Sequence, residues 1–163
     1  MSDAFPPGTG RPRLLIVEPV RHWRATFAAA ARRHAHVETL ETFTAARARL
    51  ETTQFDLVVA SLRLGPYNGI HLAHIARLID VPPHVVVHSD ESDAAAAADV
   101  QRACALYERT ERLVFALPSY LRGTLPPMDR RDPMRSDRRQ MARGGRRAWD
   151  NHLVVKEPDT PDD

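Results

Sequence analysis

The sequence has little of several features that would place a protein in a specialised class. Its 163 residues include a single cysteine, Cys104, so no internal disulfide and no cysteine-based metal site are expected. No uninterrupted apolar run approaches the roughly 20 residues that a membrane-spanning helix needs. The opening residues, MSDAFPPGTGRPR, contain no apolar core of the kind found in secretory leaders. We therefore expect a soluble, cytoplasmic protein with no membrane partner.

Lysine is nearly absent as well. Of the 23 lysine and arginine residues only Lys156 is a lysine, and the formal net charge is +2. This preference for arginine resembles a genome-level codon bias more than a selected binding surface. The length fits one domain of ordinary size with room for a tail, which argues against a multidomain enzyme.

Short aliphatic runs alternate with amphipathic stretches from residue 13 to about residue 121. This alternation is typical of strand-helix units around a parallel sheet, so the fold class predicted is α/β. Strands are expected over residues 14–17, 36–40, 56–60, 84–88 and 105–108. Helices are expected over residues 21–33, 43–52, 69–78, 92–103 and 111–121. Thr42 and Ser92 are the predicted N-caps of the second and fourth helices, and Pro118 should bend or split the last one.

The chain is expected to have three parts: a flexible N-terminus (1–11), a folded domain (12–124) and an Arg-rich, mostly disordered tail (125–163). The tail has little periodic apolar content, so burial cannot offset the entropy of ordering it. Its residues 129–150 hold eight arginines against four aspartates. Such a segment can contact anions or nucleic acid, although solvated charge is the simpler interpretation. The candidate contacts are Arg138, Arg139, Arg143, Arg146 and Arg147.

The segment DLVVASLRLGPYNG (56–69), the five alternating units and the acidic end of the first strand together resemble a known family. The family is the receiver domain of bacterial two-component response regulators. The resemblance covers roughly residues 12–124. It implies a three-layer, doubly wound (βα)5 flavodoxin-like sheet with strand order 2-1-3-4-5 and a site at the carboxyl ends of the strands.

The resemblance also implies a phosphorylation pocket, made here by Glu18, Pro19, Ser61, Ser89 and Thr110. The family carries two acidic residues where this chain has Glu18 and Pro19. It carries the phosphoacceptor aspartate at Ser61 and an invariant lysine at Thr110. Only Glu18 and Ser89 match the family pattern, so we interpret the pocket as vestigial.

Each substitution removes part of the chemistry. Aspartyl phosphorylation needs a carboxylate nucleophile and a magnesium ion held by oxygen ligands. We therefore expect no catalytic residue, no metal and no cofactor. Phosphorylation of Ser61 itself would need another kinase and a base, so a small residue filling a vacated pocket is the simpler interpretation. Ser89 and Tyr107 are either a remnant of the family's conformational switch or a strand-end hydroxyl and a half-buried core aromatic.

Three histidines are candidates for other chemistry. His71 and His74 lie three residues apart on an expected helix, but without a third ligand they indicate an exposed helical face. His88 stands next to Ser89, yet adjacent residues of a strand point to opposite faces. A hydrolase with this pair as base and nucleophile is therefore not favoured.

Three functional hypotheses follow. The first is a non-catalytic, phosphorylation-deficient receiver-like module that acts in two-component-type signal transduction by contact with a signalling protein or with a second copy of itself. The alternative is a nucleic-acid-associated regulatory factor that binds through its Arg-rich tail, with binding that weakens steeply as salt rises. In the third, acetyl phosphate or a kinase still modifies the protein.

Overall fold

The computed structural model of this chain describes residues 10–123 and 125. The chain divides into two units, Met1–Arg130 and Arg131–Asp163, and every described residue lies in the first. Residues 1–9 and 126–163 of the expected N-terminus and tail lie outside the described residues, so the predicted domain boundaries stay predictions. No helix in the described part is long and apolar enough to cross a membrane.

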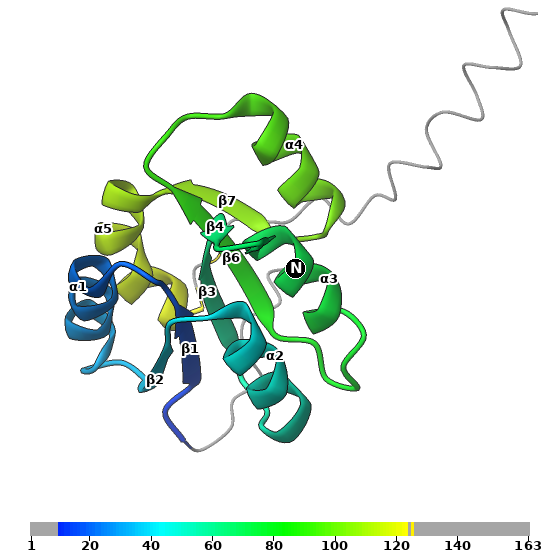
Figure 1. Cartoon of the computed structure of the whole chain (residues 1–163). Helices are drawn as coiled ribbons and strands as arrows, with labels where there is room; N and C mark the ends of the chain where they lie inside the picture. Colours follow the sequence, from blue (N-terminus) through cyan, green and yellow to red (C-terminus); the bar gives the residue numbers. More distant parts are fainter. Residues whose placement is uncertain (1–9, 124, 126–163) are drawn as a thin grey trace, which may run out of the picture. The chain divides into compact units, whose positions relative to one another are not determined.

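A parallel sheet of five strands forms the centre of the described domain, in the order β2-β1-β3-β6-β7 (Figure 1). The strands are β1 (Arg13–Val17), β2 (His36–Leu40), β3 (Leu57–Ser61), β6 (His84–Ser89) and β7 (Leu106–Arg109). The predicted fold class and strand order are confirmed. In this topology the carboxyl ends of all five strands lie at one edge of the sheet, where such folds form their sites.

Helices cover both faces of the sheet and complete three layers. They are α1 (Arg21–Ala31), α2 (Phe43–Thr52), α3 (Gly69–Ala76), α4 (Ala94–Arg102) and α5 (Thr110–Leu121). Helices α1 and α5 pack on one face, while α2, α3 and α4 lie over the other (Figure 1). Thr42 caps α2 as predicted, because its hydroxyl accepts the N–H of Ala45.

Two hydrophobic cores follow from the alternation of side chains along each strand. Leu14 and Ile16 of β1 face α1 and α5 and pack with Phe27. Leu15 and Val17 face the opposite layer. All five side chains are fully buried. The continuous aliphatic runs of the central strands are therefore explained by burial on both faces.

Three local features differ from the sequence-based expectation. A short antiparallel hairpin, β4 (Arg63–Leu64) and β5 (Tyr67–Asn68), occupies the loop after β3. The N-cap of α4 is Asp93 rather than Ser92, because the Asp93 carboxylate accepts the N–H groups of two residues in the first turn at 2.9 and 3.0 Å. Pro118 lies inside α5 without splitting it, because buried side chains on both sides of it hold the last turn against the sheet.

Gly69 fixes the approach of α3 to the end of β3. A Cβ atom at this position would lie 2.6 Å from the backbone oxygen of Ser61 and 3.0 Å from Cγ1 of Val87. Asn68 and His71 form a capping box that starts the helix there. Helix α3 therefore begins directly against the strand end that carries Ser61.

Candidate functional site

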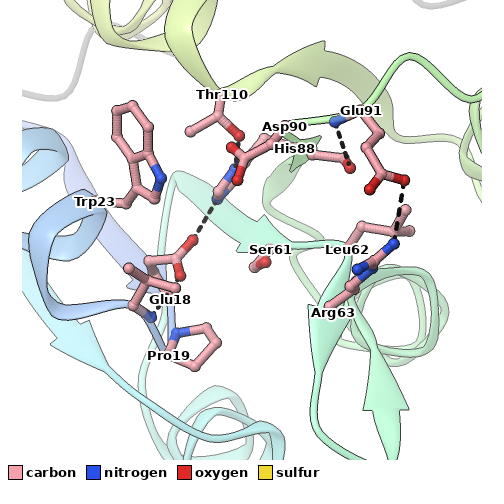
Figure 2. A pocket seen from close by; sticks show the side chains of 12 residues that line it. Glu18, Pro19, Trp23, Ser61, Leu62, Arg63, His88, Asp90, Glu91 and Thr110 are labelled. Atoms are coloured by element: carbon pink, nitrogen blue, oxygen red, sulfur yellow. Dashed lines mark hydrogen bonds and ion pairs between the residues drawn. The ribbon is translucent and has the colours of Figure 1, made fainter.

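A pocket of about 270 Å³ lies at the carboxyl edge of the sheet (Figure 2). It is formed where β1, β3 and β6 end and where α5 begins. Its lining comprises Glu18, Pro19, Val20, Trp23, Ser61, Leu62, Arg63, His88, Ser89, Asp90, Glu91 and Thr110.

The structure brings together all five residues of the sequence-predicted pocket. Glu18 and Pro19 follow β1, Ser61 ends β3, Ser89 ends β6 and Thr110 begins α5 directly after β7. Each reaches the pocket because parallel strands place their carboxyl ends at the same edge. The chemical role assigned to these five residues stays a prediction.

A buried network of three side chains closes the inner side of the pocket (Figure 2). Nδ1 of His88 lies 3.0 Å from Oγ1 of Thr110, and Nε2 of His88 lies 3.1 Å from Oε2 of Glu18. The other carboxylate oxygen of Glu18 accepts the N–H of Val20 at 2.7 Å. All three members of the network are at least 98% buried. The network therefore joins the ends of β1 and β6 to the first residue of α5.

The Glu18 carboxylate decides which ring nitrogen of a neutral His88 carries the proton. A carboxylate only accepts hydrogen bonds, so the favourable tautomer has its proton on Nε2, and Nδ1 then accepts the Thr110 hydroxyl. The 3.1 Å contact is close, but its geometry is not that of a hydrogen bond, and Nε2 has no other partner in the described part of the chain. The attraction between His88 and Glu18 is therefore mainly electrostatic.

Comparison with known proteins identifies the architecture. No protein-family model and no curated protein matches the sequence. A CheY-like receiver domain protein from Methanospirillum hungatei JF-1 has a TM-score of 0.61 at 17% identity, over 69% of this chain and 94% of that chain. The BeF3-activated DrrB receiver domain has a TM-score of 0.59 at 17% identity, over 69% and 98%. The Thermotoga maritima response regulator DrrB, an OmpR/PhoB homolog, has a TM-score of 0.60 at 16% identity, over 69% of this chain and 53% of that chain.

The chain has the receiver-domain fold. Identities this low establish the fold alone, so the chemistry of this receiver-like domain has to be inferred from its side chains. At the position expected to hold the acceptor aspartate it presents the Ser61 hydroxyl, which forms no hydrogen bond within the described residues and points into the pocket (Figure 2). At the position expected to hold lysine it presents Thr110, which is 1% exposed and bonded to His88.

The charged residues of the pocket are mostly engaged. Both oxygens of Glu18 have partners, and Glu91 pairs with Arg63 at 3.2 Å. Within the described ranges no group of three or more histidine, cysteine, aspartate or glutamate side chains is placed to hold a metal ion. Lys156 and the candidate anion contacts of the tail lie outside the described residues.

The expected switch pair contacts one loop. The Ser89 hydroxyl accepts the N–H of Glu91 at 3.3 Å, and the Tyr107 hydroxyl donates to the carbonyl of Glu91 at 2.8 Å. Arg109 donates to the carbonyl of Asp90 in the same loop. The loop after β6 is therefore anchored to β7 by two side chains. A switch role for Ser89 and Tyr107 stays a prediction.

The sequence-based interpretation did not single out His88 as a member of the pocket. It placed His88 on the face opposite Ser89, and the structure puts His88 in the layer of α1, edge-on to Phe27 at 4.9 Å between ring centroids. The interpretation missed that the side chains of Glu18 and Thr110 also lie in the layer of α1. A histidine at the end of the apolar run HVVVH was the available signal, because a buried polar side chain needs partners.

Proposed function

We propose that the chain is a receiver-like signalling module that takes up no phosphoryl group in its carboxyl-edge pocket and acts through contact with a protein partner. The observation that carries this proposal is the pocket at the carboxyl edge, where a serine hydroxyl stands at the acceptor position. An alcohol is a far weaker nucleophile than a carboxylate unless a base activates it. The nearby imidazole of His88 faces Glu18 and Thr110 instead.

The remaining groups of the pocket support the same proposal. Magnesium requires several oxygen ligands, and it neutralises the charge that moves in phosphoryl transfer. Pro19 offers no side-chain oxygen, and Glu18 already contacts Val20 and His88. Thr110 cannot supply the cationic amine of a lysine. The nucleophile, one metal ligand and the cation that the family pattern predicts are thus replaced, at Ser61, Pro19 and Thr110 respectively.

The distances between neighbouring side chains of this network are those of a catalytic triad, in which Thr110 would be the nucleophile, His88 the base and Glu18 the acid that orients the base. Their exposed fractions of 1%, 2% and 2% leave the reacting atoms covered. The network is better understood as a structural brace that closes the inner side of a pocket not used for phosphoryl transfer.

Intact mass after incubation with acetyl phosphate and magnesium tests the first half of the proposal. We expect no mass increase for the wild-type chain. A variant with Pro19→Asp, Ser61→Asp and Thr110→Lys is the matched control and should gain one phosphoryl group if it folds. The wild-type result decides by itself: a phosphoryl gain that disappears in Ser61→Ala would overturn the proposal.

The exposed side chain of Phe115 on α5 supports the second part of the proposal, that the chain acts through contact with a protein partner. Its side chain is 83% exposed, beside Arg112, which is 78% exposed. Aromatic and arginine side chains are the commonest anchors of protein interfaces. A protein recovered from the native host with the wild-type chain should be lost with Phe115→Ala. It should be retained with Leu78→Ala, because Leu78 is equally exposed, at 85%, but lies after α3. Equal recovery with both variants would exclude α5 as the contact.

A further inference from the structure

Two basic segments meet at the amino edge of the sheet, opposite the pocket. One precedes and begins β1 and contains Arg11 and Arg13, and the other joins α1 to β2 and contains Arg32 and Arg33. We call these four residues the amino-edge arginines. The N–H of His36 donates to the carbonyl of Pro12 at 2.8 Å, so the two segments lie side by side, as β1 and β2 do in Figure 1.

The amino-edge arginines carry charge that the described domain does not neutralise. All four are exposed, and none forms an ion pair within residues 10–123 and 125. Of the ten other described arginines, six pair with carboxylates, namely Arg24, Arg47, Arg49, Arg63, Arg102 and Arg112. The remaining four, Arg21, Arg77, Arg109 and Arg122, form no ion pair within the described residues either, but they lie on or directly after four different elements. Asp56 lies at the same edge, and its carboxylate accepts the backbone N–H of Arg13 at 2.7 Å, so one negative charge stands beside the four arginines and leaves them in excess.

The helix dipole explains only part of this cluster. Arg32 is the C-cap of α1 and Arg33 follows it, so both interact favourably with the negative end of the helix. No helix ends at Arg11 or Arg13. The guanidinium of Arg13 lies over the Phe55 ring, 5.7 Å from its centroid, which holds the charge at the surface. A site for an external anion explains all four residues together.

We propose that the amino-edge arginines bind the phosphate backbone of nucleic acid. Neighbouring strands are about 4.8 Å apart, so the pairing of the two segments brings the four arginines to the same end of the sheet. A nucleic-acid strand presents its phosphates at short, regular intervals. One guanidinium group can donate two parallel hydrogen bonds to two oxygens of a phosphate. An acidic protein surface lacks that regular array. The site is remote from the carboxyl-edge pocket, so the proposal does not rest on the proposed signalling function.

Binding of the full chain to a fluorescein-labelled, mixed-sequence DNA duplex, measured by fluorescence polarisation over a series of salt concentrations, tests the proposal. The edge variant carries Arg11→Gln, Arg32→Gln and Arg33→Gln. The matched control carries Arg47→Gln, Arg63→Gln and Arg102→Gln, which removes the same charge from exposed, ion-paired positions. We expect the edge variant to bind about tenfold more weakly or worse, with a salt slope reduced by about 0.9 for each lost phosphate contact. The control should stay close to the wild-type chain.

Each other outcome contradicts the proposal. Equal affinity and equal salt slope for the edge variant and the wild-type chain would remove the amino edge from the interface. Wild-type affinity of the edge variant, together with complete loss of binding on changing the five tail arginines, Arg138, Arg139, Arg143, Arg146 and Arg147, to glutamine, would assign the interaction to the tail alone. Binding to polyglutamate but not to DNA would indicate an acidic protein partner instead. Thermal unfolding of every variant verifies that it is folded.

Discussion

The ring of His88 lies between two buried groups, the Glu18 carboxylate and the Thr110 hydroxyl, and forms a hydrogen bond with the hydroxyl alone. Within the described domain it is the one basic side chain in ion-pair distance of that carboxylate. A buried charge that loses its partner keeps its desolvation cost without compensation. The stability of the pocket should therefore depend on this residue more than on any other polar side chain nearby.

We expect His88→Ala to lower the free energy of unfolding by about 2 to 4 kcal/mol, because it opens a cavity and leaves the buried Thr110 hydroxyl and Glu18 carboxylate without their neighbour. Urea denaturation measures the effect. His74→Ala is the matched control, because His74 is exposed on α3, and it should change stability by less than about 1 kcal/mol. A double-mutant cycle with Glu18→Gln should give a coupling of about 1 kcal/mol or more. A loss below 1 kcal/mol for His88→Ala would show that the contact has no energetic weight.

Several pocket residues could be predicted from the sequence because of where they stand. The resemblance to the receiver family assigned Glu18, Ser61 and Thr110 to one pocket, and their positions agree with it, because each ends or follows a predicted strand and strand ends gather at one edge of a parallel sheet. The partners of each side chain could not be predicted in this way. Whether His88 contacts Glu18 depends on the facing layer and the reach of two side chains, which no local pattern records.

At the scale of elements, the end of α5 is fastened to β7 by a buried contact. The hydroxyl of Tyr120 donates to the Glu108 carboxylate at 2.6 Å, and Arg112 lies 3.5 Å from the other oxygen of Glu108. Burial of Tyr120, together with this hydrogen bond to a carboxylate, raises the pKa of the Tyr120 hydroxyl above its ordinary value of about 10. The protonated hydroxyl is thus favoured in the folded state.

This shift has a defined sign in the pH dependence of stability. Because the pKa of Tyr120 is higher in the folded state, its contribution is fully present below pH 10 and is lost as pH rises above that value. Tyr120→Phe should cost about 2 kcal/mol at neutral pH, as expected for a hydrogen bond to a charged group. Between pH 9 and 11 the unfolding free energy of the wild-type chain should fall more steeply than that of the variant. Parallel pH profiles in urea denaturation would contradict the prediction.

The secondary structure was predictable where periodicity and capping agree. Strand β2 and helix α2 begin and end at the predicted residues, because each is bounded by clear breaks and α2 has a threonine cap. The hairpin β4–β5 was not predicted, since its two-residue strands are too short to show a period. Ser92 and Asp93 are both good caps in isolation, and only the direction of the chain entering α4 selects Asp93.

At the scale of the whole described domain, charge is separated between the two edges of the sheet. The pocket at the carboxyl edge is lined by three acidic residues, Glu18, Asp90 and Glu91, and one arginine, Arg63, whereas the amino edge carries the four amino-edge arginines beside Asp56. Such a separation orients a protein in the field of a charged partner before contact. The two edges can therefore be tested independently: the carboxyl edge by its reaction with a phosphoryl donor, and the amino edge by its binding to a polyanion.

Ligand-dependent stability is the measurement at this scale that reports directly on the pocket. A ligand that binds only the folded state raises the unfolding free energy by about 2.7 kcal/mol at one hundred times its dissociation constant. A beryllofluoride complex needs the acceptor carboxylate and magnesium, and this pocket offers Ser61 and an engaged Glu18. We therefore expect the melting temperature of the wild-type chain to stay within about 1 °C when magnesium and beryllofluoride are added together.

The comparison variant is the one with Pro19→Asp, Ser61→Asp and Thr110→Lys, measured at the same protein and ligand concentrations. Its melting temperature should rise by several degrees, because the added carboxylates and amine supply the missing ligands. Magnesium alone, without beryllofluoride, separates simple cation binding from occupation of the acceptor position. A wild-type shift as large as that of the variant would mean that Ser61 and Glu18 still complete a working acceptor site, and the brace formed by Glu18, His88 and Thr110 would then have to open on binding.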